Sequence, residues 1–305
     1  MRHRVVITGM GWVTPLGHEL EAVWQRLLRA ESGIGPIRHF DASTFPTTFA
    51  AQVKEDYDFR ALVSHPELHE GVHLNTQFAL GAAAQAWKMA GLDGAADLDR
   101  DRVGIYLGSG EGQIDFDNYV ASDLAAWDPA AKKVDAARWA GVAAAKMSAR
   151  HESEQEPFMP LTHLALEFDA RGPTSNCLTA CAASTQAIGE AMSILQRGDA
   201  DAMITGGAHT MIHPFGVTGF NRLTALSTLN DDPQAASRPF NADRGGFVLG
   251  EGAGMFILET LDHAQARGAT ILGEIAGYGS TADAYRITDI HPDGRGAVLA
   301  MTQAI

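Results

Sequence analysis

Apolar residues along this chain fall into short runs that alternate with longer stretches of helical spacing. Short runs typical of buried strands occur at residues 5–8, 103–107, 202–205, 255–258 and 271–276. Helical or alanine-rich stretches lie between them, at residues 20–29, 78–89, 136–150 and 261–267, and a last one begins near Gly296. Because strands and helices alternate, we predict an α/β fold in which most strands pair in parallel.

A further helix is predicted directly after the second of the two cysteines. Residues 182–197 are mostly small or apolar and contain no proline, and Gly198 then supplies a typical helix end. Gly172 and Pro173 mark a turn before this stretch. Cys181 therefore falls where a strand ends and a helix begins.

That position has chemical consequences for Cys181. The unpaired N–H groups and the macrodipole at a helix N-terminus favour an anion, so a thiolate becomes accessible near neutral pH. A nucleophile on a sharp strand-to-helix turn is typical of covalent acyl-transfer enzymes. A lone cysteine among small residues is, however, usually buried and inert. The local sequence alone leaves both interpretations open.

Composition narrows the class of protein. The chain has 305 residues, of which 46% are hydrophobic and 20% charged, as is ordinary for a globular core. A net charge of −14 argues against nucleic-acid binding. Two cysteines are too few for a disulfide scaffold or a zinc site, and they fit a reducing cytoplasm. We predict that Cys177 is a packed core residue.

Neither a membrane segment nor a cofactor is expected. The first residues lead into a strand without the apolar segment of a secretory signal, and no run approaches roughly 18 apolar residues. The glycine-rich segment 243–254 lacks the lysine and the spacing of a phosphate-binding loop. We interpret its glycines as close strand packing, and Asp243, Arg244 and Glu251 as paired to one another. No cofactor and no metal ion are predicted.

Several motifs, taken in order, resemble one enzyme family. Thr179-Ala180-Cys181-Ala182 resembles the nucleophile motif of the beta-ketoacyl-acyl-carrier-protein synthases, the elongating type II condensing enzymes. Further segments match this family in the same order, at residues 5–11, 14–17, 108–110, 199–208, 226–228, 236–240, 243–254, 283–285 and 291–294. The resemblance runs over essentially the whole chain, and this many ordered motifs are more specific than any single one.

The resemblance implies a thiolase-like fold, with two related halves layered helix–sheet–helix–sheet–helix. Residues 1–268 are then expected to form the N-terminal half, which carries the nucleophile, and residues 269–305 the beginning of the C-terminal half. The family also uses a lysine and two histidines, in His-Gly-Thr and Gly-His motifs, which we expect beyond Ile305. The second half is thus expected to be incomplete, and this stretch alone to be inactive in condensation.

The resemblance also implies a reaction, a partner and an assembly. Cys181 is expected to attack the thioester of an acyl carrier protein and become an acyl-enzyme. A malonyl thioester then loses CO2, and its carbanion attacks the acyl group, in fatty-acid or polyketide synthesis. The implied partner is the acyl carrier protein, and the complete protein is expected to be a homodimer that binds neither nucleic acid nor membranes.

Three further residues are predicted to contact the substrate. Phe220 and Phe247 resemble the wall of the family's acyl channel, although ordinary core aromatics explain them equally well. Glu111 follows Gly108-Ser109-Gly110, where family members often carry an apolar residue. Because a carboxylate is costly to bury beside an alkyl chain, we hypothesise a preference for short or polar acyl chains.

Two other functions stay open at this point. One is a thioester-loading acyltransferase that never condenses, and the other is a non-catalytic partner subunit, against which the retention of Cys181 argues. Residues 115–156 match the family least. We interpret them as an inserted surface helix and loop, with a cap near the substrate entrance as the alternative.

Overall fold

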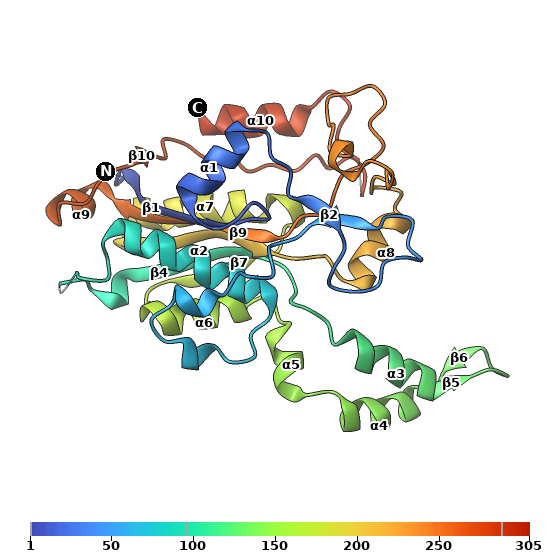
Figure 1. The fold of residues 1–305 in the computed structure, drawn as a ribbon. Helices are drawn as coiled ribbons and strands as arrows, with labels where there is room; N and C mark the ends of the chain where they lie inside the picture. The colour runs from blue at the N-terminus through green and yellow to red at the C-terminus, as the bar shows by residue number, and fades with distance from the viewer. Residues whose placement is uncertain (1, 96, 288) are drawn as a thin grey trace.

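A six-stranded mixed sheet forms the centre of the molecule (Figure 1). The computed structural model describes residues 2–95, 97–287 and 289–305. In spatial order the strands are β10 (Gly273–Glu274), β1 (Val5–Val13), β9 (Gly252–Thr260), β8 (Ala202–His209), β4 (Val103–Ser109) and β7 (Thr174–Cys177). The predicted α/β fold is confirmed, and β10 shows that residues after 268 add a strand to this same sheet. The domain boundary at residue 268 stays a prediction.

The prediction of mostly parallel pairing is wrong. Strand β4 pairs in parallel with β7 and β8, whereas β8–β9, β9–β1 and β1–β10 are antiparallel. A buried strand reads as an apolar run in either direction, so the hydrophobic pattern does not report strand direction. The segment between β8 and β9 starts and finishes at the same end of the sheet, so β9 runs antiparallel to β8.

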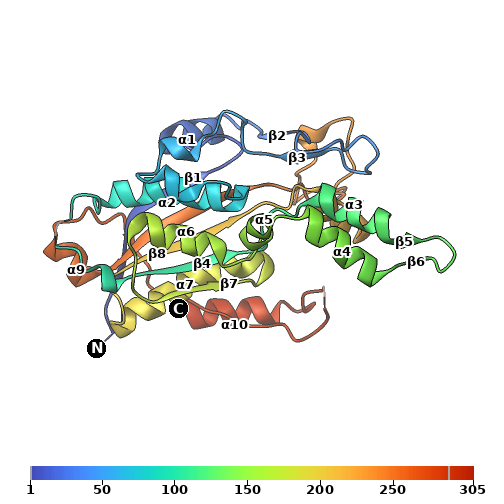
Figure 2. The same ribbon diagram turned by 90° about the horizontal axis from the view of Figure 1, so that it is seen from below.

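Helices cover both faces of the sheet (Figure 1). On one face α2 (Leu74–Ala90) and α6 (Met159–Phe168) pack on Ile105, Ile204 and Ile257, among others. On the other face α7 (Ala183–Arg197) packs on Met203 and Leu258. The side chains of adjacent strand residues such as Met203 and Ile204 therefore pack on opposite faces of the sheet, as the two-residue period of a strand requires. Outside α7 lies α10 (Arg295–Ala304), the helix expected near Gly296 (Figure 2).

Most predicted helices are confirmed, and one is wrong. The stretches at 20–29 and 261–267 form α1 (Leu20–Leu28) and α9 (Leu261–Ala266), and α7 ends at Gly198, whose φ is 77°. The single helix expected at 136–150 is instead two, α4 (Ala136–Lys146) and α5 (Ala149–Glu154). The break occurs because Met147 is extended and the Ser148 hydroxyl accepts a hydrogen bond from the His151 amide, which starts a new helix.

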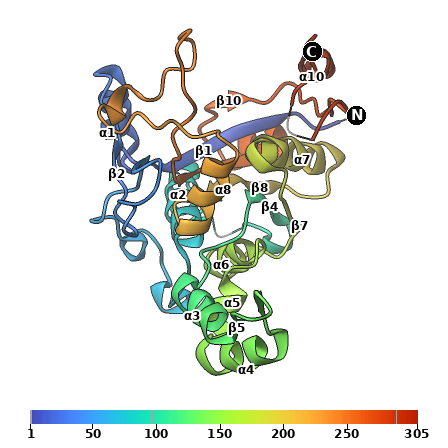
Figure 3. The same cartoon turned by 90° about the vertical axis from the view of Figure 1, so that its right-hand side faces the viewer.

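Residues 115–156 project from the body as an arm (Figures 1 and 3). The arm consists of α3 (Phe116–Ala126), the hairpin of β5 (Trp127–Asp128) and β6 (Lys133–Val134), then α4 and α5. This outlying arrangement agrees with the interpretation of a surface insertion. The remaining elements are the hairpin of β2 (Ile34–Pro36) with β3 (Phe49–Ala51), helix α8 (Pro214–Arg222) and short 3-10 turns. In the described part of the chain, every helix is too short or too polar to cross a bilayer.

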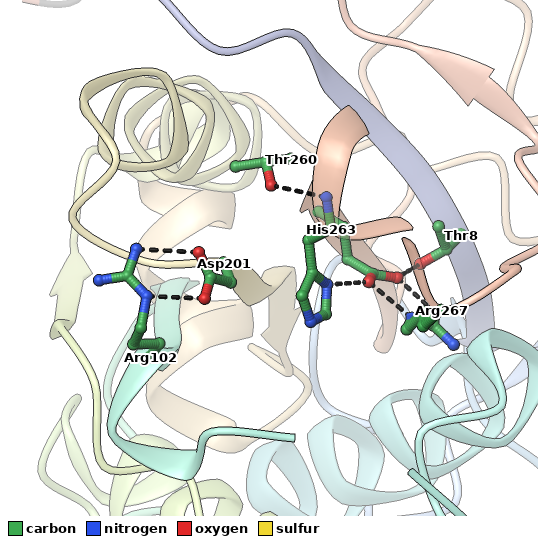
Figure 4. A network of polar contacts seen from close by, with 7 residues as sticks. Thr8, Arg102, Asp201, Thr260, His263 and Arg267 are labelled. Atoms are coloured by element: carbon green, nitrogen blue, oxygen red, sulfur yellow. Dashed lines mark hydrogen bonds and ion pairs between the residues drawn. The ribbon is translucent and has the colours of Figure 1, made fainter. Parts of the chain in front are cut away.

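A buried carboxylate links β1, β9 and the end of α9 (Figure 4). Glu259 on β9 is completely buried. It accepts hydrogen bonds from the Thr8 hydroxyl on β1, from His263 Nδ1 at 2.6 Å, and from two guanidinium nitrogens of Arg267 at 2.5 and 2.8 Å. Burial acts to raise the pKa of Glu259, but these hydrogen bonds outweigh it and lower the pKa to about 2. Glu259 is therefore ionised in the folded protein at neutral pH.

Replacing Glu259 with glutamine should destabilise the protein. The Arg267 guanidinium then loses its counter-ion in a buried site, so we expect the free energy of unfolding at pH 7 to fall by about 3 kcal/mol. Urea titration measures this change. The matched control is Glu274→Gln, which removes the exposed Arg4–Glu274 pair and should cost much less.

The same variant tests the pH dependence. In the unfolded chain Glu259 protonates near its ordinary value of 4.5, so its contribution to stability is present above that pH. That contribution is lost as the pH falls toward about 2. Wild type should therefore lose more stability in acid than Glu259→Gln does. Equal costs of the two glutamine variants at pH 7, or a cost of Glu259→Gln that does not shrink in acid, would contradict the assignment.

Candidate active site around Cys181

Cys181 lies on a sharp turn between a strand and a helix, as its sequence context predicts. Strand β7 ends at Cys177, residues 180–182 form a 3-10 turn, and α7 begins at Ala183. Ala180 has a left-handed backbone with φ of 52°. That conformation costs an L-residue other than glycine roughly 1–2 kcal/mol. Such strain is typical of turns that present a nucleophile, and no sequence signal at Ala180 predicted it.

Two glycines let the start of α7 approach the sheet closely. A side chain on Gly108, near the end of β4, would collide with the backbone of Ala183 and Ser184. A side chain on Gly207 of β8 would collide with the Ser184 side chain and the Gly108 carbonyl. The helix start, and with it Cys181, is therefore seated directly on the ends of two strands.

Cys181 opens into a cavity of about 590 Å³ at the end of the sheet. The walls come from the turn at Cys181, the ends of β4 and β8, and the segments before β9 and after β1. The lining residues are Val13 to Pro15, Ala51, Gly108 to Gly110, Ala180, Cys181, Ala183, Ser184, Gly207 to His209 and Gly250 to Gly254. Most of these lining residues have small side chains.

The two cysteines differ in environment. Cys181 is exposed, whereas Cys177 is half-buried rather than fully packed, and its Sγ donates to the Ala183 carbonyl at 3.2 Å. Burial raises the pKa of the Cys177 thiol. Since the thiolate is the nucleophile, Cys177 is poorly suited to covalent chemistry and Cys181 is the accessible sulfur.

Glu251 is a residue of the cavity wall that the sequence analysis misjudged. Its side chain, 1% exposed, accepts hydrogen bonds from the Val53 amide at 2.9 Å and the Thr210 hydroxyl at 2.7 Å, and contacts His39 Nε2 at 3.1 Å. The expected pairing among Asp243, Arg244 and Glu251 is wrong. Asp243 lies 3.6 Å from Arg238, and Arg244 donates to the Asn241 carbonyl. The partners of Glu251 are far away in the sequence, which is why local charge pairing failed.

His209 also lines the cavity. Its Nε2 lies 3.2 Å from the Glu111 carbonyl oxygen, so this nitrogen carries the proton and donates. Burial lowers the pKa of His209. His209 is therefore a neutral ring at the wall. The signal that could have found it is its place at the end of β8, two residues after Gly207.

Of the three predicted substrate residues, Glu111 adjoins the cavity wall and the two phenylalanines do not line it. Glu111 directly follows Gly110, a wall residue, and its carbonyl contacts His209. Phe220 on α8 and Phe247 make an edge-to-face contact with ring centroids 5.3 Å apart. Neither phenylalanine is in the cavity lining, and Phe247 is 45% exposed. Their role in substrate binding stays a prediction.

One group of side chains at the root of the arm has the composition of a metal site. Ligand atoms of Asp115, His151 and Glu152 lie within 4.8 Å of one another. Asp115 already accepts from the amide and side chain of Asn118, and Glu152 accepts from Gln155. Three of the four carboxylate oxygens therefore have partners and Glu152 Oε1 has none among the described residues, and we assign no metal to this group.

The comparisons with known proteins agree with this geometry. The family model "Beta-ketoacyl synthase, N-terminal domain" matches residues 2–264. The chain is 38% identical over 304 residues to the 3-oxoacyl-[acyl-carrier-protein] synthase 2 of Coxiella burnetii, covering 100% of this chain and 69% of that relative.

Solved structures similar to this chain are also ketosynthases. A beta-ketoacyl synthase from Burkholderia phymatum superposes with a TM-score of 0.82 at 28% identity, over 99% of this chain and 70% of that one. A type II polyketide ketosynthase in complex with its acyl carrier protein superposes with a TM-score of 0.77 at 29% identity, again over 99% of this chain and 70% of that one. The chain thus belongs to the beta-ketoacyl synthase family, the thiolase-like condensing enzymes of fatty-acid and polyketide synthesis.

Replacing Gly108 with alanine should displace Cys181 without touching it. The added methyl group meets the backbone of Ala183 and Ser184, which cannot swing aside as a flexible side chain can. We expect a loss of about 1–3 kcal/mol in stability, as for an overpacked core, and a changed rate of Cys181 alkylation by iodoacetamide. The matched control is Gly245→Ala, where no atom lies within 4 Å of the new methyl group. Unchanged stability and alkylation in Gly108→Ala would refute this role of Gly108.

Proposed function

We propose that Cys181 is the nucleophile of a decarboxylative condensing enzyme, and that it accepts an acyl group from an acyl carrier protein. The observation that carries this proposal is the exposed sulfur of Cys181, on a left-handed turn at the start of α7, facing an open cavity. Family membership supplies the reaction class.

The first step is thioester exchange at Cys181. The sulfur attacks the carbonyl carbon of the acyl thioester, the new carbon–sulfur bond forms, and the carrier's thiolate leaves. The transient oxyanion needs hydrogen-bond donors, and the backbone N–H of Cys181, at the start of the 3-10 turn, is one candidate. The second donor that the family uses is expected outside these 305 residues.

The second step joins two carbon chains. A malonyl thioester loses CO2, its carbanion attacks the acyl carbon, and the Cys181 sulfur departs as the leaving group. The sequence contains no His-Gly-Thr motif, and its Gly-His pair, Gly17-His18, belongs to the opening turn and not to the family's late motif. We place the family's two histidine motifs in the part of the relatives that this chain does not span, since it covers 69% of the Coxiella burnetii protein. Residues 1–305 then carry the nucleophile for loading, and condensation needs groups that lie outside them.

The proposed partners are an acyl carrier protein and a second copy of the complete protein. The ketosynthase solved in complex with its acyl carrier protein supports the first partner. A non-catalytic partner subunit is the competing function, and the retained Cys181 argues against it because such a subunit needs no nucleophile. The chain's own net charge of −14 means that docking an acidic carrier requires a local basic patch.

Acyl loading is the direct test of the nucleophile. After incubation with an acyl-carrier thioester, the intact mass of the protein should rise by one acyl group, and peptide mapping should place that group on Cys181. Cys181→Ala should show no adduct, whereas Cys177→Ala should load like wild type because Cys177 is half-buried with a raised pKa. Equal loading of Cys181→Ala and wild type would exclude this role.

The proposed selectivity for short or polar acyl chains is tested at Glu111. In Glu111→Leu the carboxylate no longer has to be desolvated beside an alkyl chain, so palmitoyl loading should speed up roughly tenfold relative to butyryl loading. The control is Gln113→Leu, an exposed position in the same loop. If wild type already loads palmitoyl and butyryl groups equally fast, Glu111 does not set the chain length.

A further inference from the structure

Four titratable side chains form a buried row between the arm and the body, separate from the Cys181 cavity. In order along the row they are Glu167 on α6, His69 in the 3-10 turn Pro66–His69, His163 on α6, and Glu154 at the end of α5. All four are buried. We call this group the histidine row. It holds α5, the last helix of the arm, against α6 of the body.

Three contacts connect the members of the histidine row. His69 Nε2 lies 3.0 Å from Glu167 Oε2, and His69 Nδ1 lies 2.9 Å from His163 Nδ1. His163 Nε2 lies 3.2 Å from both oxygens of Glu154. Glu167 also accepts from the Ser64 and His65 amides, at 2.5 and 3.3 Å, so both of its oxygens act as hydrogen-bond acceptors.

Counting protons decides the charge of the histidine row. Every contact joins two atoms that carry lone pairs, so each one needs a shared proton to be attractive. Two neutral imidazole rings bring one N–H each, and ionised carboxylates bring none. Three contacts therefore need one proton more than two neutral histidines supply. Without it, the two Nδ1 lone pairs or an Nε2 and a carboxylate would face each other across about 3 Å in a buried site.

We infer that the histidine row binds one additional proton in the folded protein and releases it only when the contact between α5 and α6 loosens. The proton resides on His69, which then donates to both Glu167 and His163. His163 is the neutral ring, with Nδ1 accepting and Nε2 donating to Glu154. A neutral His163 agrees with its pKa, which burial lowers.

Other charged groups around the histidine row leave this assignment intact. Arg150 on α5 is a cation that acts on His163 in the same sense as burial. His73 and His151 stack beside the row with ring centroids 4.3 Å apart, and burial lowers the pKa of His73 to about 4, so this ring is neutral above that pH. His65 is exposed and pairs with Glu67 at 3.6 Å. The third proton therefore has to come from solvent.

The histidine row is linked to the active-site wall through the backbone. The carbonyl of Gln155, the residue after Glu154, accepts a hydrogen bond from the Gly112 amide at 2.7 Å. The Gln113 amide donates to His73 Nδ1 at 3.1 Å. Gly112 lies two residues from Gly110, which lines the Cys181 cavity. Loosening α5 at high pH should therefore loosen the loop at residues 110–113.

Nuclear magnetic resonance of wild type tests the proton count directly. With histidines labelled with ¹⁵N in the complete protein, His69 should show both ring nitrogens protonated at about pH 7.5, where an ordinary histidine is neutral. Two neutral rings at that pH would overturn the inference, and this result does not depend on any variant folding.

A glutamine variant provides the second test. In Glu154→Gln the amide N–H can donate to His163 Nε2, which supplies the third proton permanently, so all three contacts persist with two neutral histidines. Wild type should lose melting temperature as the pH rises from about 7 to about 9, because the folded state then holds a proton that unfolded histidines have released. Glu154→Gln should lack this loss and keep slow amide exchange at residues 110–113.

The matched control is Glu156→Gln, which makes the same change of charge two residues away at an exposed position. This control should follow the wild-type pH profile. If Glu154→Gln and Glu156→Gln show the same dependence of melting temperature on pH as wild type, the histidine row carries no additional proton.

Discussion

The contact on which the site depends is the close seating of α7 on the ends of β4 and β8. Gly108 and Gly207 have no side chains, so the first residues of the helix lie against strand backbone. This contact fixes both the direction in which α7 leaves the sheet and the position of the turn that carries Cys181. The six-stranded sheet supplies a rigid base for it, because α2 and α6 fill the opposite face and hold the strands in place. A small shift of one strand would therefore move the sulfur as well.

The hydrophobic pattern predicted the strands at β1, β4, β8 and β9 and the helix that follows Cys181, because each is a long element with a clear start or stop signal. It did not predict strand direction, since apolar runs look alike in parallel and antiparallel pairs. The break between α4 and α5 was missed because Met147 and Ser148 are tolerated in a helix, and only the capping by Ser148 decides the outcome.

The candidate site was predictable to the extent that it is local. Cys181 is found by its neighbours along the chain, whereas Glu251 and His209 join it only through the fold. The partners of Glu251 are His39, Val53 and Thr210, on three separate segments. No spacing rule connects such positions, so a sequence that identifies a nucleophile can still hide the groups that share its cavity.

The left-handed backbone of Ala180 limits which sequences can carry this site. Among natural residues, glycine adopts that conformation freely, asparagine and aspartate adopt it with modest strain, and β-branched residues avoid it. Variation at position 180 should therefore follow backbone preference rather than size or polarity. A valine there differs from alanine by only two methyl groups, yet it would push the turn into another conformation and aim the neighbouring sulfur away from the cavity.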